Sequence, residues 1–318
     1  MSQKQIILAE TMGYCWGVRR TLEIIEAAGD HDNPVATIGD VIHNPQVVDR
    51  LRSHGVDTAA SIAEAAERGF TRVAITAHGA GPQMAIEARE HGLELLDTTC
   101  PLVTKVQRMA NKLARQGYTV VVYGDGYHPE VKGIVGWADT TRIHSAKTIA
   151  DLPWTAPRGS KEPGAVTPPR KVAVVSQTTK NTDEFMKFVN DLTALVSREG
   201  GEIRICNTIC EPTYERQNAL KNLAGQVDLI LAIGGRKSSN TARLADVGNQ
   251  MGVPSHHIER AEDIDLNWLT GIDRVGITAG ASTPDDVIQS VIDYLTIVGY
   301  AEPDRLFASG SLEAVPAY

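Results

Sequence analysis

The sequence predicts an α/β protein in which one structural unit occurs three times. Short β-branched runs alternate with amphipathic segments along most of the 318 residues, a pattern typical of parallel strands joined by helices. Three cysteines, Cys15, Cys100 and Cys210, each lie between a strand run and a helical segment. A second polar loop follows each cysteine at a constant offset of 28 residues (15 to 43, 100 to 128 and 210 to 238). These loops read IHNP, YHPE and KSSN.

The strand predictions rest on apolar runs bounded by turn residues. The expected strands are residues 5–9, 73–77, 93–97, 119–124, 171–176, 202–206, 229–235 and 275–280. Helical segments follow them, and the clearest begins at Pro101. Its apolar residues recur at helical spacing: Leu102, Val106, Met109 and Leu113.

A third loop completes each unit and contains His78, Thr178 or Ser282. The repeat is longer than the period of about 20–50 residues that solenoids show, so a compact triplet of domains is expected. Residues 155–170, with four prolines and two glycines, are expected to form a mobile surface loop. The expected domains are residues 1–100, 101–205 and 206–285, followed by a C-terminal helix and tail at 286–318.

Composition narrows the class of protein. Hydrophobic residues make up 42% and charged residues 22%, as in a globular protein with a real core. The net charge of −8 argues against nucleic acid as a partner. No segment reaches the roughly 18 apolar residues of a membrane span, and the first residues do not form a secretory signal. We therefore expect a cytoplasmic protein without a membrane partner, in which the thiols of the four dispersed cysteines stay available as metal ligands.

Three thiolates in equivalent loops predict a soft metal centre. A helix N-terminus favours a thiolate, and thiolates suit either zinc or an iron–sulfur cluster. The cysteines alone leave both possibilities open. Cys206 would lie 32 residues before Ser238 (206 to 238) rather than 28, and it ends an apolar run. It is therefore expected to be a small core residue.

The second and third loops add hydrogen-bond donors at the same strand ends as the cysteines. Donors of this kind can hold an anion such as a phosphate group. The predicted anion-binding residues are His43, His78, His128, Thr178, Ser238, Ser239, Asn240 and Ser282.

Two of these loops are expected at helix starts. Ser238–Asn240 lies just before an expected helix at 241–250, whose backbone N–H groups and dipole favour an anion. Ser282 or Thr283 is expected to cap a helix in which Pro284 occupies the first position.

Glu130 is the one acid in these loops that we assign to chemistry. Pro129 favours an extended conformation at His128, and extended residues two apart face the same side. We therefore expect His128 and Glu130 both to enter the site. A buried carboxylate beside thiolates and an anion would have a raised pKa and could carry a proton.

Nucleotide-binding motifs are missing from the sequence. It contains neither a G-x-G-x-x-G at a strand–helix junction nor a Walker A loop. Electrons for a redox step are therefore expected to arrive from another protein.

A set of longer motifs resembles one known family. The segments GYCWGV, VIHNPQVV, TAHGAGP, DTTCPLVTKV, YHPEVKG, SQTT, NTIC with ERQ, KSSN and GITAGASTPD together look like 4-hydroxy-3-methylbut-2-enyl diphosphate reductase. That family catalyses the last step of the methylerythritol phosphate route to isoprenoids. The matching segments run from Gly13 to Asp285, nearly the whole chain.

The resemblance implies a pseudo-threefold trefoil of three α/β domains around a [4Fe-4S] cluster. Cys15, Cys100 and Cys210 match the cluster ligands, which leaves one iron open to the substrate hydroxyl. Apart from Thr178, the anion-binding set given above matches the residues that hold the substrate diphosphate, and Thr178 is an implied substrate-binding residue. His128, Glu130 and Thr178 are the implied catalytic residues, the last two in a proton-delivery network. The reaction implied is reductive dehydroxylation to isopentenyl and dimethylallyl diphosphates, with electrons from a ferredoxin or flavodoxin.

Two other functions compete with this interpretation. A metal-dependent hydrolase of a small phosphorylated substrate would explain the anion site, but catalytic zinc sites use few thiolates. A non-catalytic iron–sulfur sensor would explain the cysteines, but it gives no role to Glu130 or to the anion-binding loops.

Overall fold

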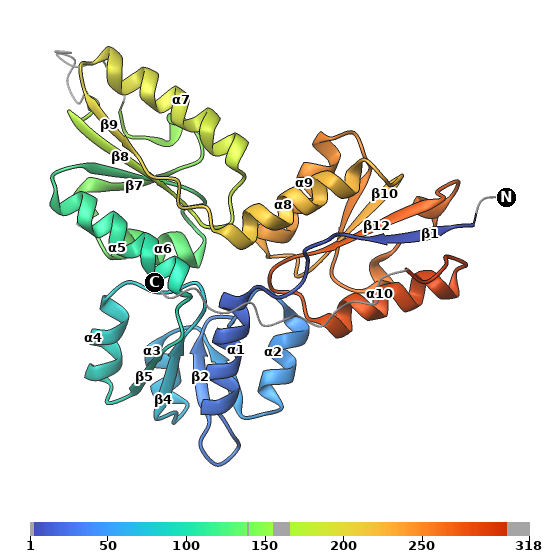
Figure 1. Cartoon of the computed structure of the whole chain (residues 1–318). Coiled ribbons are helices and arrows are strands. Elements are labelled where there is room, and N and C mark those ends of the chain that lie inside the picture. The colour runs from blue at the N-terminus through green and yellow to red at the C-terminus, as the bar shows by residue number, and fades with distance from the viewer. Residues whose placement is uncertain (1–2, 139, 155–165, 304–318) are drawn as a thin grey trace. The chain divides into compact units, whose positions relative to one another are not determined.

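The computed structural model describes residues 3–138, 140–154 and 166–303. Strands alternate with helices along the chain (Figure 1) and form three four-stranded sheets with parallel pairing. The prediction of an α/β fold with three similar sheets is confirmed. The proposed mobile loop, in its part at 155–165, and the tail from residue 304 lie outside the described residues. Within the described ranges, no helix is both long and apolar enough to cross a membrane.

The three sheets have the same strand order. The first sheet is ordered β3 (Val56–Ala59), β2 (Val35–Ile38), β4 (Arg72–Ile75) and β5 (Glu94–Asp97). The second is ordered β7 (Ile143–Ala146), β6 (Thr119–Tyr123), β8 (Lys171–Ser176) and β9 (Glu202–Ile205). The third is ordered β11 (Ser255–Ile258), β10 (Leu229–Ile233), β12 (Arg274–Ala279) and β1 (Gln5–Leu8).

Each cysteine was expected to lie in the same unit as the polar loop 28 residues later, but the structure places it after a strand of another sheet. Cys15, Cys100 and Cys210 follow the edge strands β1, β5 and β9. Cys100 and Cys210 therefore come after the last strand of the first and second sheets, and Cys15 follows an edge strand of the third sheet. The segment at 5–9 was expected to begin the first unit, but β1 pairs with β12, with Gln5 opposite Arg274. That part of the repeat interpretation is wrong. Pairing between the two ends of a chain leaves no trace in local sequence pattern.

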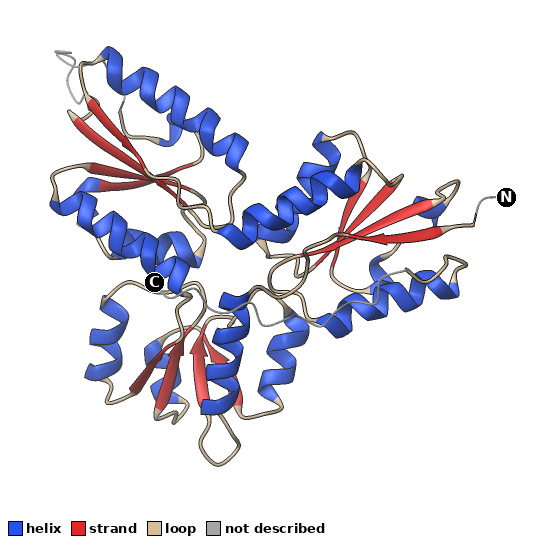
Figure 2. Ribbon diagram, in the orientation of Figure 1, coloured by secondary structure: helices blue, strands red, loops and turns tan. Residues whose placement is uncertain are grey.

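Figure 2 shows helices connecting the strands. Ten α-helices lie in the described residues. They are α1 (Trp16–Ala28), α2 (Pro45–Arg52), α3 (Ile62–Glu67), α4 (Gln83–Glu90), α5 (Pro101–Arg115), α6 (Pro129–Gly136), α7 (Thr182–Arg198), α8 (Glu211–Ala224), α9 (Ser239–Gln250) and α10 (Asp285–Ile297). Side-chain hydrogen bonds cap the first turns of several of these helices. Asn44 and Asn181 accept hydrogen bonds from the third residue of α2 and α7, at 3.2 and 3.0 Å.

The second sheet shows how alternating residues bury both faces. Val120 and Val122 of β6 pack with residues of α5 and α6, whereas Val121 and Tyr123 pack with residues of α7. Figure 1 shows α5 and α6 on one side of this sheet and α7 on the other. A strand covered on both faces is continuously apolar, as the TVVVY run is.

Helix α5 forms as predicted, but its buried face is wider than the predicted stripe. Val106 and Leu113 are buried, whereas Leu102 and Met109 are only partly buried. The face also contains small residues and one amide, which a search for large apolar side chains passes over. These additional buried residues are Val103, Gln107, Ala110 and Ala114.

The chain divides into two compact units. Unit 1 consists of Met1–His31, Asp40–Asp57 and Glu211–Tyr318. Unit 2 consists of Asp32–Gly39 and Thr58–Cys210. The finer domain boundaries at residues 100, 205 and 285 stay a prediction.

Candidate active site

Each of Cys15, Cys100 and Cys210 directly precedes the first residue of a helix, namely α1, α5 and α8. The carbonyls of Cys15 and Cys100 accept first-turn hydrogen bonds at 3.0 Å. All four cysteines of the chain are among the described residues, and none of them forms a disulfide. Three thiols at the positive ends of helices are suitable ligands for a cationic metal centre.

The backbone of each cysteine is also tied to the third loop of its own sheet. The bonds run from Cys15 N to Ala281 O (3.2 Å), from Cys100 N to Ala77 O (3.1 Å) and from Cys210 N to Thr178 O (3.0 Å). Ser282 and His78 directly follow two of the accepting residues, and Thr178 is the third. Each cysteine is thereby fixed beside a predicted substrate-binding residue.

In unit 2, the structure brings His78 and His128 together. Their ring centroids are 5.4 Å apart in an edge-on arrangement. Nδ1 of His128 accepts a hydrogen bond from Glu130 N at 3.1 Å, at the start of α6. Because Nδ1 accepts, the proton of the neutral ring lies on Nε2, which makes Nε2 a donor suited to an anion.

The loop that carries His78 is clamped between two helices of unit 2. Trp137 Nε1 donates to Ala80 O at 2.7 Å, and the buried Gln107 amide donates to the same carbonyl at 3.4 Å. A Cβ at Gly81 would lie 3.2 Å from the Cα of Gly136, so two glycines allow the loop to lie against α6. These contacts fix the backbone beside His78.

Glu130 and Thr178 form a buried pair in unit 2. Thr178 N donates to Glu130 Oε1 at 2.6 Å, and Thr178 Oγ1 donates to Oε2 at 2.8 Å. Glu130 is only 2% exposed. Burial raises the pKa of Glu130 to about 7, although the Thr178 hydrogen bonds and the Lys180 charge oppose the rise. The carboxyl can therefore hold a proton near neutral pH.

We expected Glu130 to lie on an extended segment two residues after His128, and this expectation is wrong. His128 is extended, but Pro129 begins α6, so Glu130 lies in the first helical turn and not two residues along a strand. Proline suits the first helical position because its missing N–H has no partner there in any helix. The carboxylate consequently reaches Thr178 from a helix start.

In unit 1, the loop with His43 packs against the loop that follows β10. A Cβ at Gly235 would lie 1.9 Å from the carbonyl oxygen of His43, so only glycine fits there. Gln46 Nε2 also donates to Glu259 O at 3.2 Å. Burial lowers the pKa of His43, which keeps its ring neutral at pH 7.

The KSSN loop provides a buried amide at the start of α9. Ser238 is the N-cap, and its Oγ accepts from Thr241 N at 3.3 Å. Ser239 and Asn240 lie inside the first turn, so the helix begins two residues earlier than expected. Asn240 is 4% exposed, and neither its Oδ1 nor its Nδ2 has a hydrogen-bond partner among the described residues. A buried amide without partners indicates a position for a ligand.

Ser282 lies in a loop of unit 1, not at a helix cap. Helix α10 begins at Asp285, and its N-cap is Pro284, whose side chain has no cap hydrogen bond. Thr283 is buried and donates to Ile233 O at 2.8 Å instead. The expected capping by Ser282 or Thr283 is therefore wrong, since Thr283 binds the end of β10. Ser282 itself is partly buried, next to Ala281 and Cys15.

Cys206, unlike the other three cysteines, does not directly precede a helix. It directly follows β9 and lies four residues before Cys210. Its N–H donates to Val174 O at 2.9 Å, and its side chain packs against the core between β6, α5 and α6.

Arg216 is a buried residue of α8 in unit 1, and the sequence assigned it no role although it belongs to the ERQ segment of the resemblance. Its Nε and Nη2 donate to Gly13 O at 3.2 and 2.7 Å, and its Nη1 donates to Pro212 O at 2.9 Å. Gly13 has a φ of 75°, which favours glycine, and it lies two residues before Cys15. Arg216 therefore fixes the loop of that cysteine. The contact joins residues about 200 apart, so the local sequence pattern around Arg216 does not predict it.

Comparisons with known proteins show which family this chain belongs to. The model of the LytB protein family matches residues 6–296. A relative from Geobacter sp. (strain M21), 4-hydroxy-3-methylbut-2-enyl diphosphate reductase, is 40% identical over 294 residues, which are 92% of this chain and 98% of the relative. A protein of the same name from Dehalococcoides mccartyi (strain CBDB1) is 38% identical over 289 residues, with 90% and 96% covered.

Two solved structures are also similar. A structure of (E)-4-hydroxy-3-methyl-but-2-enyl diphosphate reductase, described as the terminal enzyme of the non-mevalonate pathway, is 35% identical, with a TM-score of 0.62 over 92% of this chain and 99% of that one. The reductase from Plasmodium falciparum is 25% identical, with a TM-score of 0.80 over 92% and 88%.

Proposed function

Since the chain belongs to the LytB protein family, we propose that it reduces (E)-4-hydroxy-3-methylbut-2-enyl diphosphate to isopentenyl and dimethylallyl diphosphates. It is an oxidoreductase of isoprenoid biosynthesis. In the reaction the allylic C–O bond breaks, two electrons and two protons are taken up, a C–H bond forms, and water leaves. The observation that carries the proposal is the buried Glu130–Thr178 pair, an acid with a pKa of about 7 in the unit that holds Cys100 and Cys210.

The LytB family uses an iron–sulfur cluster, and the donor set of this chain fits one. Three thiols in equivalent positions at helix starts provide soft ligands of the right type. We propose Cys15, Cys100 and Cys210 as the ligands of a [4Fe-4S] cluster. Bound there, the cluster would supply one-electron transfers and an iron without a cysteine ligand.

The remaining site residues bind the substrate and move a proton. The diphosphate is held by hydrogen-bond donors: His43, His78, His128, Ser238, Ser239, Asn240 and Ser282. Thr178 also contacts the substrate. Protonated Glu130 can donate through Oε2 to Thr178 Oγ1, which then turns its own hydroxyl proton toward the substrate. This relay delivers a proton while the carboxylate itself stays buried.

The partners follow from the same chemistry. The sequence contains no nucleotide-binding motif, so we propose a ferredoxin or flavodoxin as electron donor and the cytoplasm as the location. A hydrolase would need none of this electron supply. Metal analysis of anaerobically purified protein separates the possibilities: iron with acid-labile sulfide supports the cluster, whereas stoichiometric zinc without sulfide contradicts it.

Replacing Asn240 by alanine is expected to raise the substrate KM about 10- to 100-fold. A hydrogen bond to a charged group is worth about 1.5–3 kcal/mol, and the Asn240 amide has no other partner in the described chain. Gln250→Ala, at the exposed end of the same helix, is the control. Steady-state kinetics and the cluster absorption spectrum check this. An unchanged KM would remove Asn240 from the diphosphate site.

Replacing Trp137 by phenylalanine is expected to raise KM about 2- to 10-fold, with the cluster intact. Phenylalanine keeps a ring but loses the hydrogen bond to Ala80 O, which fixes the loop of His78, and a neutral bond contributes about 0.5–1.5 kcal/mol. Trp154→Phe, whose ring lies edge-on to His144 elsewhere in unit 2, is the control. The same small effect in both variants would show that the loop contact is unimportant for substrate binding.

A further inference from the structure

Helix α5 has an unusual concentration of positive charge. Among its 15 residues are four basic side chains, Lys105, Arg108, Lys112 and Arg115, and no acid. The chain as a whole has 39 acidic and 31 basic residues. Spacings of three and four residues place the four cations on one face of the helix, opposite the buried face.

Three of these cations have no counter-charge. Arg108, Lys112 and Arg115 are exposed, and none of their side chains forms an ion pair or hydrogen bond in the part of the chain that the structure describes. Some cations elsewhere are paired, such as Arg68 with Glu64 at 3.2 Å and Arg274 with Asp228 at 2.9 Å. The charges of Arg108, Lys112 and Arg115 are not neutralised in this way.

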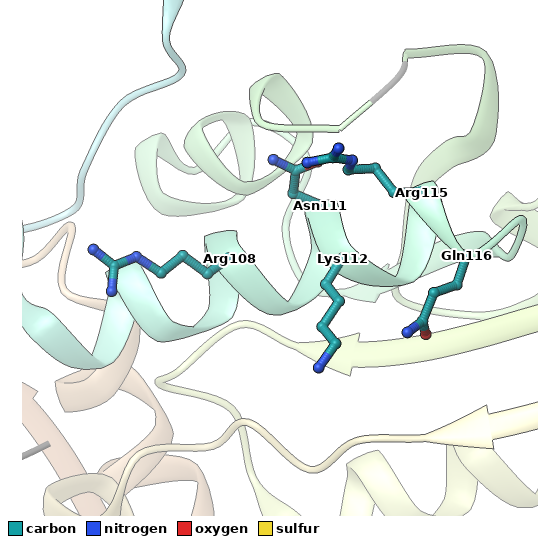
Figure 3. A pocket seen from close by; sticks show the side chains of 5 residues that line it. All are labelled: Arg108, Asn111, Lys112, Arg115 and Gln116. Carbon is teal, nitrogen blue, oxygen red and sulfur yellow. The ribbon is translucent and has the colours of Figure 1, made fainter.

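The cations surround a shallow hollow. A pocket of about 290 Å³ is lined by side chains that project from α5 and its end (Figure 3). They are Arg108, Asn111, Lys112, Arg115 and Gln116. Gln116 Oε1 accepts from the exposed Arg204 at 3.4 Å, which extends the positive surface to β9.

This face is linked to the proposed cluster by the helix itself. Cys100 directly precedes α5, so Arg108 lies about 12 Å farther along the helix axis at 1.5 Å per residue. A standard protein interface covers about 800 Å² of each partner. The width of such a patch is roughly the length of α5. A protein docked over α5 would therefore reach close to a cluster ligand.

We propose that the exposed face of α5 is the docking surface for a small acidic one-electron carrier protein. The inference rests on the proposed reduction, which consumes two electrons that the chain has no nucleotide site to supply. An acidic partner complements the cations, which would accelerate encounter and orient the carrier beside Cys100. A small anion in the pocket is the competing occupant. It would gain little, because the lining cations are exposed to solvent.

Charge reversal on the holoenzyme tests the proposal. The variant is Arg108→Glu with Lys112→Glu, and the control is Lys187→Glu with Arg198→Glu on the exposed face of α7, which changes net charge equally. Turnover is measured with a reduced acidic [2Fe–2S] ferredoxin and, separately, with a small-molecule reductant. We expect the α5 variant to raise the apparent KM for the ferredoxin at least about tenfold and to lose most of its salt dependence. Its rate with the small reductant should not change.

Three other results would contradict the proposal that α5 is the docking surface. Equal loss in both double variants would indicate a general charge effect, and an unchanged ferredoxin KM would remove α5 from the interface. A changed KM for the diphosphate substrate, or binding of inorganic diphosphate that only the α5 variant loses, would show a small-anion site instead. Failure of the proposed function is distinct, because the wild-type protein would then lack turnover with the small reductant as well.

Discussion

Replacing Glu130 by glutamine is expected to lower turnover about 10²- to 10⁴-fold, the usual contribution of a general acid. Glutamine keeps the size of the side chain and can still accept one hydrogen bond from Thr178, but it has no acidic proton. Cluster absorption and substrate binding should be retained, because Glu130 is a ligand of neither in this account. Single-turnover rates and a substrate binding titration, both under anaerobic conditions, measure the two effects separately.

The pH profile gives the same prediction a second test. Burial favours the neutral carboxyl and raises the pKa of Glu130 to about 7, so the proton is present below that pH and lost above it. Wild-type kcat/KM should therefore fall as pH rises through about 7, by about tenfold per unit. The Glu130→Gln variant should not show this fall of kcat/KM with rising pH.

Asp125→Asn is the matched control for Glu130. Asp125 lies in the same loop region but pairs with Lys147 at 2.8 Å, and the hydrogen bond from Lys147 lowers its pKa. Its variant should keep wild-type turnover and pH profile. Near wild-type turnover in Glu130→Gln, or the same fall of kcat/KM with rising pH, would exclude Glu130 as the proton donor.

Cys210→Ser is expected to abolish the cluster and all reductase activity, whereas Cys206→Ser should purify brown and active. Cys210 directly precedes α8, as Cys15 precedes α1 and Cys100 precedes α5. Cys206 instead packs at the edge of the second sheet's core. A serine there replaces a partly buried thiol, so a small loss of stability is the only expected cost.

Iron and sulfide content, the visible spectrum and thermal unfolding of both variants check this prediction. The two cysteines are matched controls for each other, because they lie four residues apart in one loop. Reversed phenotypes would overturn both the ligand assignment and the threefold repeat from which it was inferred.

Much of the fold could be predicted because the chain repeats a local pattern. The constant offset from cysteine to second loop indicated a threefold repeat, and apolar runs marked eight of the twelve strands in the described residues. The expected ranges did not include β2, β3, β7 and β11. The pairing of β1 with β12 could not be predicted, since it joins residues some 270 apart. The same limit applies to Arg216 and Gly13, whose hydrogen bonds cross about 200 residues.

The candidate site was predictable in its residue types but less so in its geometry. Polar residues at strand ends indicated Glu130, Thr178 and Asn240. Their local conformations depended on where helices begin: Glu130 lies one residue inside α6, and Asn240 lies inside the first turn of α9. Proline and serine are compatible with several neighbouring start positions, so the exact start depends on tertiary packing.

The central claim is that this chain reduces an allylic diphosphate without breaking the diphosphate. The most direct measurement is anaerobic turnover of (E)-4-hydroxy-3-methylbut-2-enyl diphosphate by the reduced holoenzyme, with products separated and identified by mass. We expect five-carbon diphosphates that have lost the hydroxyl, with two electrons consumed per molecule. Intact substrate in the presence of a fully loaded, reduced cluster, or release of inorganic phosphate instead, would contradict it.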